Sequence, residues 1–224
     1  IALSLKYTSK LFDLCAKSQI SSIIYASSQS VYGDLKANLF DENNLPTPKD
    51  LYSLSKFGGE LMLDKLSILS PNTKYCSLRI SRLFGLGDGM KWDEVPHKFI
   101  KKIHQDKKII LHGGNQTYDL INVKDVARAI IKLISKNLEK WPSVLNISSG
   151  KPINLKNYLN IVKKNAIRIN KKKPSIKILK STKNYFKQGL NNKLAIKTLK
   201  WKPFYSINDS VIEIFNHLKR KKIL

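Results

Sequence analysis

The 224-residue chain carries 41 lysine and arginine residues against 16 aspartate and glutamate residues, a formal net charge of +25, and 42% of its residues are hydrophobic, as in ordinary globular proteins. Its apolar runs fall short of the about 18 residues that a membrane-spanning helix needs, which excludes a protein built of such spans. Residues 1–7 lack the basic start, apolar block and cleavage site of a signal peptide, so we expect a cytoplasmic protein. The length suits one domain, or one domain with a small additional lobe.

The positive charge comes almost entirely from lysine, which is spread along the whole chain. Arginine, the usual residue for reading phosphates and bases, is scarce. We therefore interpret most of the charge as a solvated surface, which makes nucleic acid an unfavoured partner. Residues 171–173 and 219–222 are basic runs and remain candidate anion patches.

Cysteine and histidine give no sign of a metal site or a disulfide framework. Cys15 and Cys76 form no CxxC pair, and we expect both to fill core positions. The four histidines show no ligand spacing, so no metal is predicted.

Hydrophobic periodicity predicts the elements in chain order, beginning with a helix whose apolar residues recur every three or four positions. The predicted helices cover residues 2–18, 52–69, 96–105, 123–135, 155–164, 191–199 and 207–219. The predicted strands cover residues 22–26, 75–80, 108–111, 144–147 and 176–179.

This alternation of helices with short apolar strands predicts an α/β fold with a mainly parallel sheet. A dinucleotide-binding half begins with a strand, a glycine-rich turn and a helix, whereas this chain opens on a helix and contains no GxGxxG. Residues 85–89 (GLGDG) follow a strand but lead into no long helix, and we interpret them as a plain loop.

The segment YSLSK at residues 52–56 is the strongest chemical signal. A spacing of four places the Tyr52 hydroxyl and the Lys56 ammonium on one helix face. A nearby ammonium favours the phenolate, so such a tyrosine can act as a general acid or base near neutral pH. The alternative is an exposed helical pair without function.

Ser28 follows the apolar strand at residues 22–26, 24 residues before Tyr52. Side chains at the carboxyl ends of parallel strands line the ligand crevice of doubly wound sheets, so this serine is placed to bind a substrate oxygen. The alternative is a turn residue that caps local backbone.

These segments, in their order, resemble the NAD-dependent epimerase/dehydratase family, the extended short-chain dehydrogenases/reductases. The strand-end segment ASSQSVYGD at residues 26–34 is similar to the family's own, and an acidic, proline-containing loop at residues 41–48 precedes the YxxxK helix as it does in the family. Further similar segments are LRISRLFG at 78–85, HGGNQTYDLINVKDVA at 112–127, LNISSG at 145–150 and LKWKP at 199–203.

The resemblance implies a partial Rossmann-like, doubly wound parallel sheet with a small C-terminal α/β substrate lobe. Residues 1–90 would be the C-terminal part of the NAD-binding domain, to which residues 108–147 contribute further elements. Residues 91–224 would mainly form the substrate lobe, interleaved with the NAD-binding domain. The family's glycine-rich first segment has no counterpart here, so the resemblance implies N-terminal truncation and weak NAD binding by this chain alone.

The resemblance also implies roles for individual residues. The implied catalytic residues are Ser28, Tyr52 and Lys56, with Tyr52 as the acid/base. The implied NAD-binding residues are Ser27, Tyr52, Lys56, Ile80 and Ser81. The implied binders of the nucleotide sugar are Ser28, Gln29, Ser30, Arg82 and Tyr118.

Three departures from the family pattern bear on the substrate. Family dehydratases carry Asp-Glu where this chain has Gln29 and Ser30, which favours an epimerase or a keto-sugar reductase. Arg82 stands at a usual asparagine, and Tyr118 stands at the usual diphosphate-binding arginine. Arg82, Lys183 or Lys187 is a candidate replacement for that arginine, since an arginine can pair bidentately with a phosphate.

The sequence thus predicts an enzyme that uses NAD, with NADP not excluded, to epimerise a nucleotide sugar or reduce a keto-sugar. A non-catalytic RNA-binding relative of the same fold, or an inactive fragment, is the alternative. The helices at residues 2–18 and 52–69 resemble the family's dimer-forming bundle, so a homodimer is also predicted.

Overall fold

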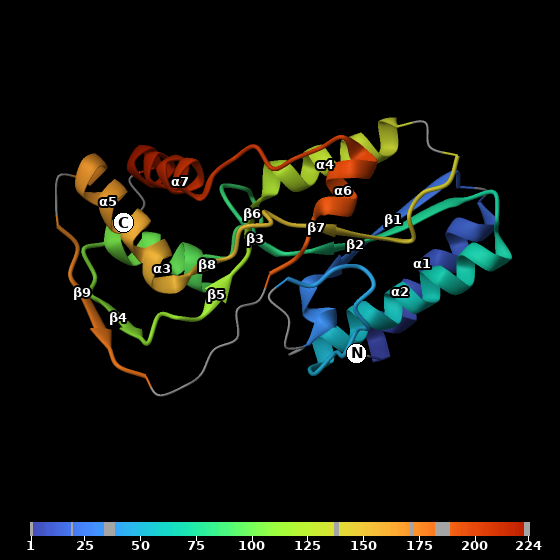
Figure 1. Cartoon of the computed structure of the whole chain (residues 1–224), viewed down its shortest axis with the longest axis horizontal. Coiled ribbons are helices and arrows are strands. Elements are labelled where there is room, and N and C mark those ends of the chain that lie inside the picture. The colour runs from blue at the N-terminus through green and yellow to red at the C-terminus, as the bar shows by residue number, and fades with distance from the viewer. Residues whose placement is uncertain are drawn as a thin grey trace.

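The computed structural model describes residues 2–18, 20–33, 39–136, 139–170, 173–181 and 189–221. Figure 1 shows an elongated molecule with two lobes. The large lobe is built on strands β1 (Ser22–Ser28), β2 (Lys74–Ile80) and β7 (Val144–Ile147), and the small lobe on strands β4 (Ile109–His112) and β9 (Ile176–Leu179).

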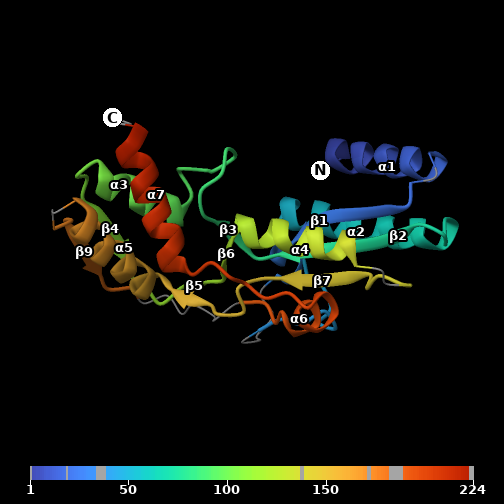
Figure 2. The same cartoon turned by 90° about the horizontal axis from the view of Figure 1, so that it is seen from above.

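The three strands of the large lobe are parallel, in the order β1-β2-β7. Helices α1 (Ala2–Lys17) and α2 (Leu51–Leu69) cover one face, and helices α4 (Val123–Ser135) and α6 (Lys193–Leu199) cover the other (Figures 1 and 2). This is the doubly wound α/β arrangement that the sequence predicted.

Helix α2 carries the YxxxK segment, and local sequence fixes both of its ends. Asp50 and Ser53 form a capping box at its start, and the helix stops before Pro71. Gly58 and Gly59 let its neighbours approach closely, because a Cβ at these positions would lie 2.8 Å from Leu5 and 2.2 Å from the Tyr25 hydroxyl.

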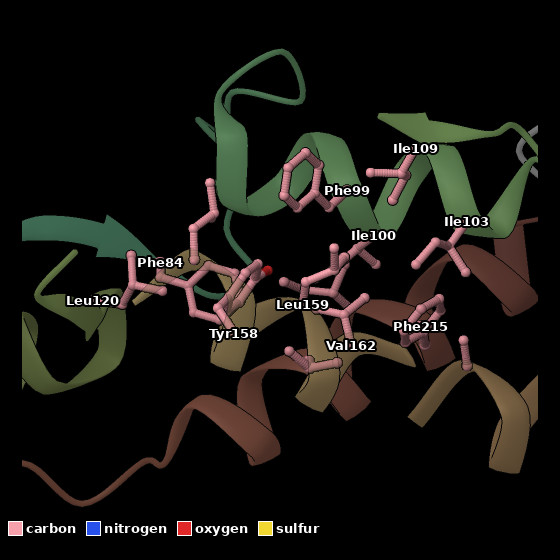
Figure 3. Packing of buried hydrophobic residues seen from close by; sticks show 14 of the residues in the cluster. Phe84, Phe99, Ile100, Ile103, Ile109, Leu120, Tyr158, Leu159, Val162 and Phe215 are labelled. Carbon is pink, nitrogen blue, oxygen red and sulfur yellow. The ribbon is translucent and has the colours of Figure 1, made fainter. Parts of the chain in front are cut away.

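Helices α3 (Val95–His104), α5 (Leu155–Asn170) and α7 (Ile207–Lys221) form the small lobe around a buried apolar cluster (Figure 3). Phe84 and Tyr158 meet edge to face in this cluster, with ring centroids 5.7 Å apart. Helix α5 extends six residues beyond the prediction, because Ala166 after the lysine pair at 163–164 is still fully buried.

Elements of residues 91–224 are divided between the two lobes. Strand β4, inside residues 108–147, pairs with β9 instead of joining the large sheet, since Ile109 and Leu111 are buried in the small-lobe cluster. Helix α4 and strand β7 from the same interval do belong to the large lobe. Helix α6 also packs there, although the prediction assigned residues 91–224 mainly to the substrate lobe.

Short strands that were not predicted join the two lobes. Strand β3 (Arg82–Phe84) pairs with β6 (Leu120–Asn122), and β5 (Thr117–Tyr118) pairs with β8 (Ile153–Asn154). An isolated bridge links Phe40 to Leu190. Segments of two or three residues are too short to show periodicity, which is why the sequence did not reveal them.

Candidate active site

The candidate site lies where the parallel strands of the large lobe end, near the middle of the molecule (Figure 1). Ser28 is the last residue of β1 and is followed at once by the 3-10 helix η1 (Gln29–Tyr32). Tyr52 is the second residue of α2, which packs on β1 and β2. Local elements thus bring the predicted serine and the YxxxK helix to the same end of the sheet.

Ser28 is half-buried, and its hydroxyl oxygen caps η1. It accepts hydrogen bonds from the Ser30 backbone N–H at 3.2 Å and from the Ser30 hydroxyl at 3.0 Å. The local capping role is therefore present, and it leaves the Ser28 hydroxyl hydrogen free to donate to another oxygen.

Tyr52 is the most exposed of the predicted catalytic residues, at 56%. Within the described part of the chain its hydroxyl has no hydrogen-bond partner. A phenol in this state is accessible to a bound molecule.

Lys56 lies between the end of β1 and the Tyr52 ring. Its Nζ donates to the Ala26 carbonyl at 2.9 Å and lies 5.8 Å from the Tyr52 ring centroid and 5.4 Å from that of Tyr25. Partial burial lowers the pKa of Lys56 below its ordinary value. An ammonium has three N–H groups, so Lys56 retains donors beyond the one that fixes it to the strand.

Ser27 differs from its predicted cofactor-binding role. Its side chain is 5% exposed, and its hydroxyl donates to the Glu60 carboxylate inside the lobe. Alternation along β1 turns Ser27 toward α2. Its hydroxyl is therefore not presented at the open site, and only a backbone contact from Ser27 remains a prediction.

Ile80 and Ser81 stand at the end of the neighbouring strand β2. Ile80 is half-buried and lines an open, apolar hollow on the α4 side of the sheet, together with Ile24, Ala26 and Ile130. Ser81 is 4% exposed, and its hydroxyl lies 3.5 Å from the Asp119 carboxylate.

The two residues that depart from the family's phosphate-binding pattern lie together. The Arg82 guanidinium lies 4.8 Å from the Tyr118 ring centroid, and its Nη1 contacts Glu94 at 3.3 Å. The buried Arg82 Nε has no partner among the described residues. The Arg82 guanidinium thus supplies a positive charge next to residue 118, where the family's usual arginine is replaced by tyrosine. Lys183 and Lys187 lie outside the described residues.

Three buried charged residues near the site were not predicted. Glu60 and Arg79 form an ion pair at 2.7 Å beneath α2. Asp119, 1% exposed, accepts hydrogen bonds from the Ser149 backbone and hydroxyl and from the Leu190 backbone. These residues could have been found in the sequence as charged residues inside apolar segments, such as Arg79 between two apolar residues of β2.

A metal site and a membrane span are both absent from what the structure describes. Among these residues no group of three or more His, Cys, Asp and Glu side chains is arranged to hold a metal ion. No described helix is both long enough and apolar enough to cross a membrane.

The fit to a dinucleotide is partial. Tyr52 and Lys56 offer a free hydroxyl and free ammonium donors at the strand ends, which suits the polar groups of a nicotinamide ribose. The printed sequence contains no glycine-rich phosphate loop, so the residues present fit the nicotinamide end alone.

Two solved structures share this fold. UDP-glucuronic acid 4-epimerase from Bacillus cereus, in complex with UDP-glucuronic acid and NAD, is 22% identical and has a TM-score of 0.82 over 97% of this chain and 68% of its own. RMD from Pseudomonas aeruginosa, complexed with NADPH, is 19% identical and has a TM-score of 0.84 over 97% of this chain and 73% of its own.

Sequence relatives cover different parts of the chain. A putative UDP-glucose 4-epimerase from Methanocaldococcus jannaschii is 29% identical over 95% of this chain and 68% of its own length. Protein CapI from Staphylococcus aureus is 29% identical over 64% of this chain and 47% of its own length. The chain thus spans from 47% to 68% of the length of these two relatives.

A family model covers residues 1–148, which include Ser28, Tyr52 and Lys56, and it describes the NAD dependent epimerase/dehydratase family. The match confirms the family of NAD-dependent enzymes that the sequence motifs predicted. The chain belongs to the NAD-dependent epimerase/dehydratase family.

Proposed function

We propose that the complete protein is an NAD-dependent epimerase of a UDP-sugar. The main support for this proposal is the position of Lys56, whose ammonium lies between the end of β1 and the ring of an exposed Tyr52. The names of the Methanocaldococcus and Bacillus relatives support UDP-sugars as the substrate class. Gln29 and Ser30, where family dehydratases carry Asp-Glu, favour epimerisation or keto-sugar reduction over dehydration.

Tyr52 is the proposed acid/base. As the phenolate, its exposed side chain takes the proton of a sugar hydroxyl during oxidation, and as the phenol it returns that proton during reduction. The Lys56 ammonium stabilises the phenolate form and holds the nicotinamide ribose. NAD held there by Tyr52 and Lys56 would supply the hydride chemistry at the sugar carbon.

Ser28 is the proposed second contact to the reacting oxygen. Its oxygen already accepts two hydrogen bonds from Ser30, so it is oriented to donate its own hydrogen to the sugar oxygen. This donation stabilises the charge that develops as Tyr52 removes the proton. Gln29 and Ser30, on η1, are proposed to contact the sugar, and Ile80 and Ser81 to lie beside the nicotinamide.

Arg82 is proposed to bind the substrate diphosphate from its place over the Tyr118 ring. It would exchange its contact with Glu94 for the phosphates, since a guanidinium pairs bidentately with such oxygens. The stacked Tyr118 holds the guanidinium plane in position.

The function is tested by incubating the complete protein and NAD with UDP-glucose, UDP-glucuronic acid and UDP-N-acetylglucosamine and separating the products by chromatography. Tyr52→Phe should lower turnover by about 100-fold to 10,000-fold while leaving the unfolding temperature unchanged, because the lost hydroxyl has no partner among the described residues. The matched control is Tyr205→Phe, a half-buried tyrosine outside both the candidate site and helices α1 and α2. Equal activity in Tyr52→Phe and the wild type contradicts the proposal.

A homodimer through α1 and α2 is also proposed. Leu3, Tyr7, Leu11 and Leu14 lie on one face of α1 and are each at least 58% exposed. Light scattering on the complete protein should give twice the monomer mass, and Leu11→Lys should give the monomer. A monomeric wild type contradicts the dimer.

A further inference from the structure

A row of buried polar residues crosses the large sheet beneath α2. Ser27 of β1 is the register partner of Arg79 of β2, and Arg79 is the partner of Asn146 of β7. Their exposures are 5%, 4% and 0%. Neighbours in register share a face, so the three side chains lie side by side on the face that carries α2 and η1.

Glu60 joins this row to the helix that carries Tyr52 and Lys56. The three residues are spaced by four along α2 and therefore share one helix face. The Glu60 carboxylate accepts the Ser27 hydroxyl and the Arg79 guanidinium, with Nε at 3.1 and 3.2 Å and Nη2 at 2.7 Å. Glu60 is 2% exposed, so little water competes for these contacts.

The same row holds the other end of the segment that contains Ser28. Tyr32, the last residue of η1, is fully buried and donates its hydroxyl to the Asn146 side chain at 2.8 Å. The Arg79 guanidinium lies 4.7 Å from the Tyr32 ring centroid. Residues 27 and 32 are thus both fixed to the row, with Ser28 between them.

Ser28 depends on these neighbours for its place. The only hydrogen bonds found for its side chain within the described residues come from Ser30, in the same short segment. The buried charges of Glu60 and Arg79 are not needed for stability alone, since apolar residues of equal volume often give a protein that is as stable. Unlike apolar packing, their hydrogen bonds are directional, so they fix residues 27–32 and helix α2 relative to each other.

We propose that Glu60 and Arg79 are positioning residues that hold Ser28 in place against Tyr52 and Lys56. They are buried and act on the reaction only through Ser28. The kinetic part of this inference rests on the proposed function, and the structural part does not.

Hydrogen exchange measured by mass spectrometry on the complete protein tests the structural part. In Glu60→Gln, peptides covering residues 26–33 should exchange about 10-fold faster or more, while those covering α5 are unchanged. Ser27→Ala removes one contact and should give a smaller increase in the same peptides. The matched control, Glu213→Gln, breaks the ion pair with Lys124 and should leave residues 26–33 unchanged.

A uniform rise in exchange across the protein, or no rise at residues 26–33, overturns the proposal. Absence of turnover in the wild type would defeat the proposed function alone, because the exchange result does not depend on activity.

A double-mutant cycle with UDP-glucose as substrate tests the kinetic part. Glu60→Gln should lower kcat about 10-fold or more and change KM by less than about 3-fold. In a Ser28→Ala background the same change should lower kcat by less than about 2-fold, since Glu60 then has no serine to position. An equal loss of kcat in both backgrounds shows a general structural role and overturns the proposal.

Discussion

Asp119→Asn should strongly destabilise the protein, although it changes only one atom of a side chain. The carboxylate is 1% exposed, and its two oxygens accept from different segments: Oδ1 from the Ser149 N–H at 3.0 Å and Oδ2 from the Leu190 N–H at 3.0 Å. An asparagine has one carbonyl oxygen, so whichever way the amide turns, its NH₂ group faces one of these two N–H donors. One buried N–H then loses its acceptor.

The magnitude follows from the two losses. A hydrogen bond to a charged acceptor contributes about 1.5 to 3 kcal/mol, and an unsatisfied buried N–H costs about 1 to 3 kcal/mol. We expect the free energy of unfolding to fall by about 3 to 5 kcal/mol, and the unfolding temperature by roughly 10 °C.

Urea unfolding of the complete protein, followed by tryptophan fluorescence and circular dichroism, measures this change. Asp209→Asn is the matched control, because Asp209 is exposed and the amide keeps an acceptor for the Ser206 N–H. The control should lose less than about 1 kcal/mol. A loss below about 1 kcal/mol for Asp119→Asn would refute the argument that both oxygens are needed.

Two further changes probe the interior of the large lobe. Burial raises the pKa of Glu42 above its ordinary value, so the ionised carboxylate weakens the fold above its folded pKa, and protonation relieves this as the pH falls. Glu42→Gln keeps an acceptor for the Asn146 N–H and should therefore stabilise the protein at pH 7, by an amount that shrinks toward low pH in urea titrations; a gain independent of pH would contradict this. Gly59→Ala should cost about 1 to 3 kcal/mol in thermal unfolding, because its Cβ would lie 2.2 Å from the Tyr25 hydroxyl. Gly89→Ala, with nothing within 4 Å, should be neutral, and equal effects of the two glycine changes would show that the contact does not matter.

The sequence revealed those parts of the site that depend on local spacing. Tyr52 and Lys56 share a helix face because they are four residues apart, and Ser28 ends the strand that the apolar run at residues 22–26 predicted. These relations hold wherever the elements lie in the fold. The motifs then identified the family, and with it the α/β architecture.

The residues that the sequence did not reveal depend on contacts between distant segments. Glu60 and Arg79 are 19 residues apart and meet only because α2 packs on β2. Ser27 was predicted to bind the cofactor, and local sequence did not reveal that the alternation of β1 turns its hydroxyl toward Glu60. The pairing of β4 with β9 could not be predicted, because an apolar run of four residues does not specify its partner strand.

The row of Ser27, Arg79 and Asn146 also specifies the alignment of the strands. Side chains alternate along a strand, so a slip of β2 by one residue would turn Arg79 to the opposite face. That face is lined by Ile24 and Ile130, where a guanidinium would have no carboxylate to pair with. A misaligned sheet therefore carries an unpaired buried charge, whereas a slip among purely apolar strands would cost far less. The polar row therefore disfavours pairings of β1, β2 and β7 that are shifted by one residue, whether or not a ligand is bound.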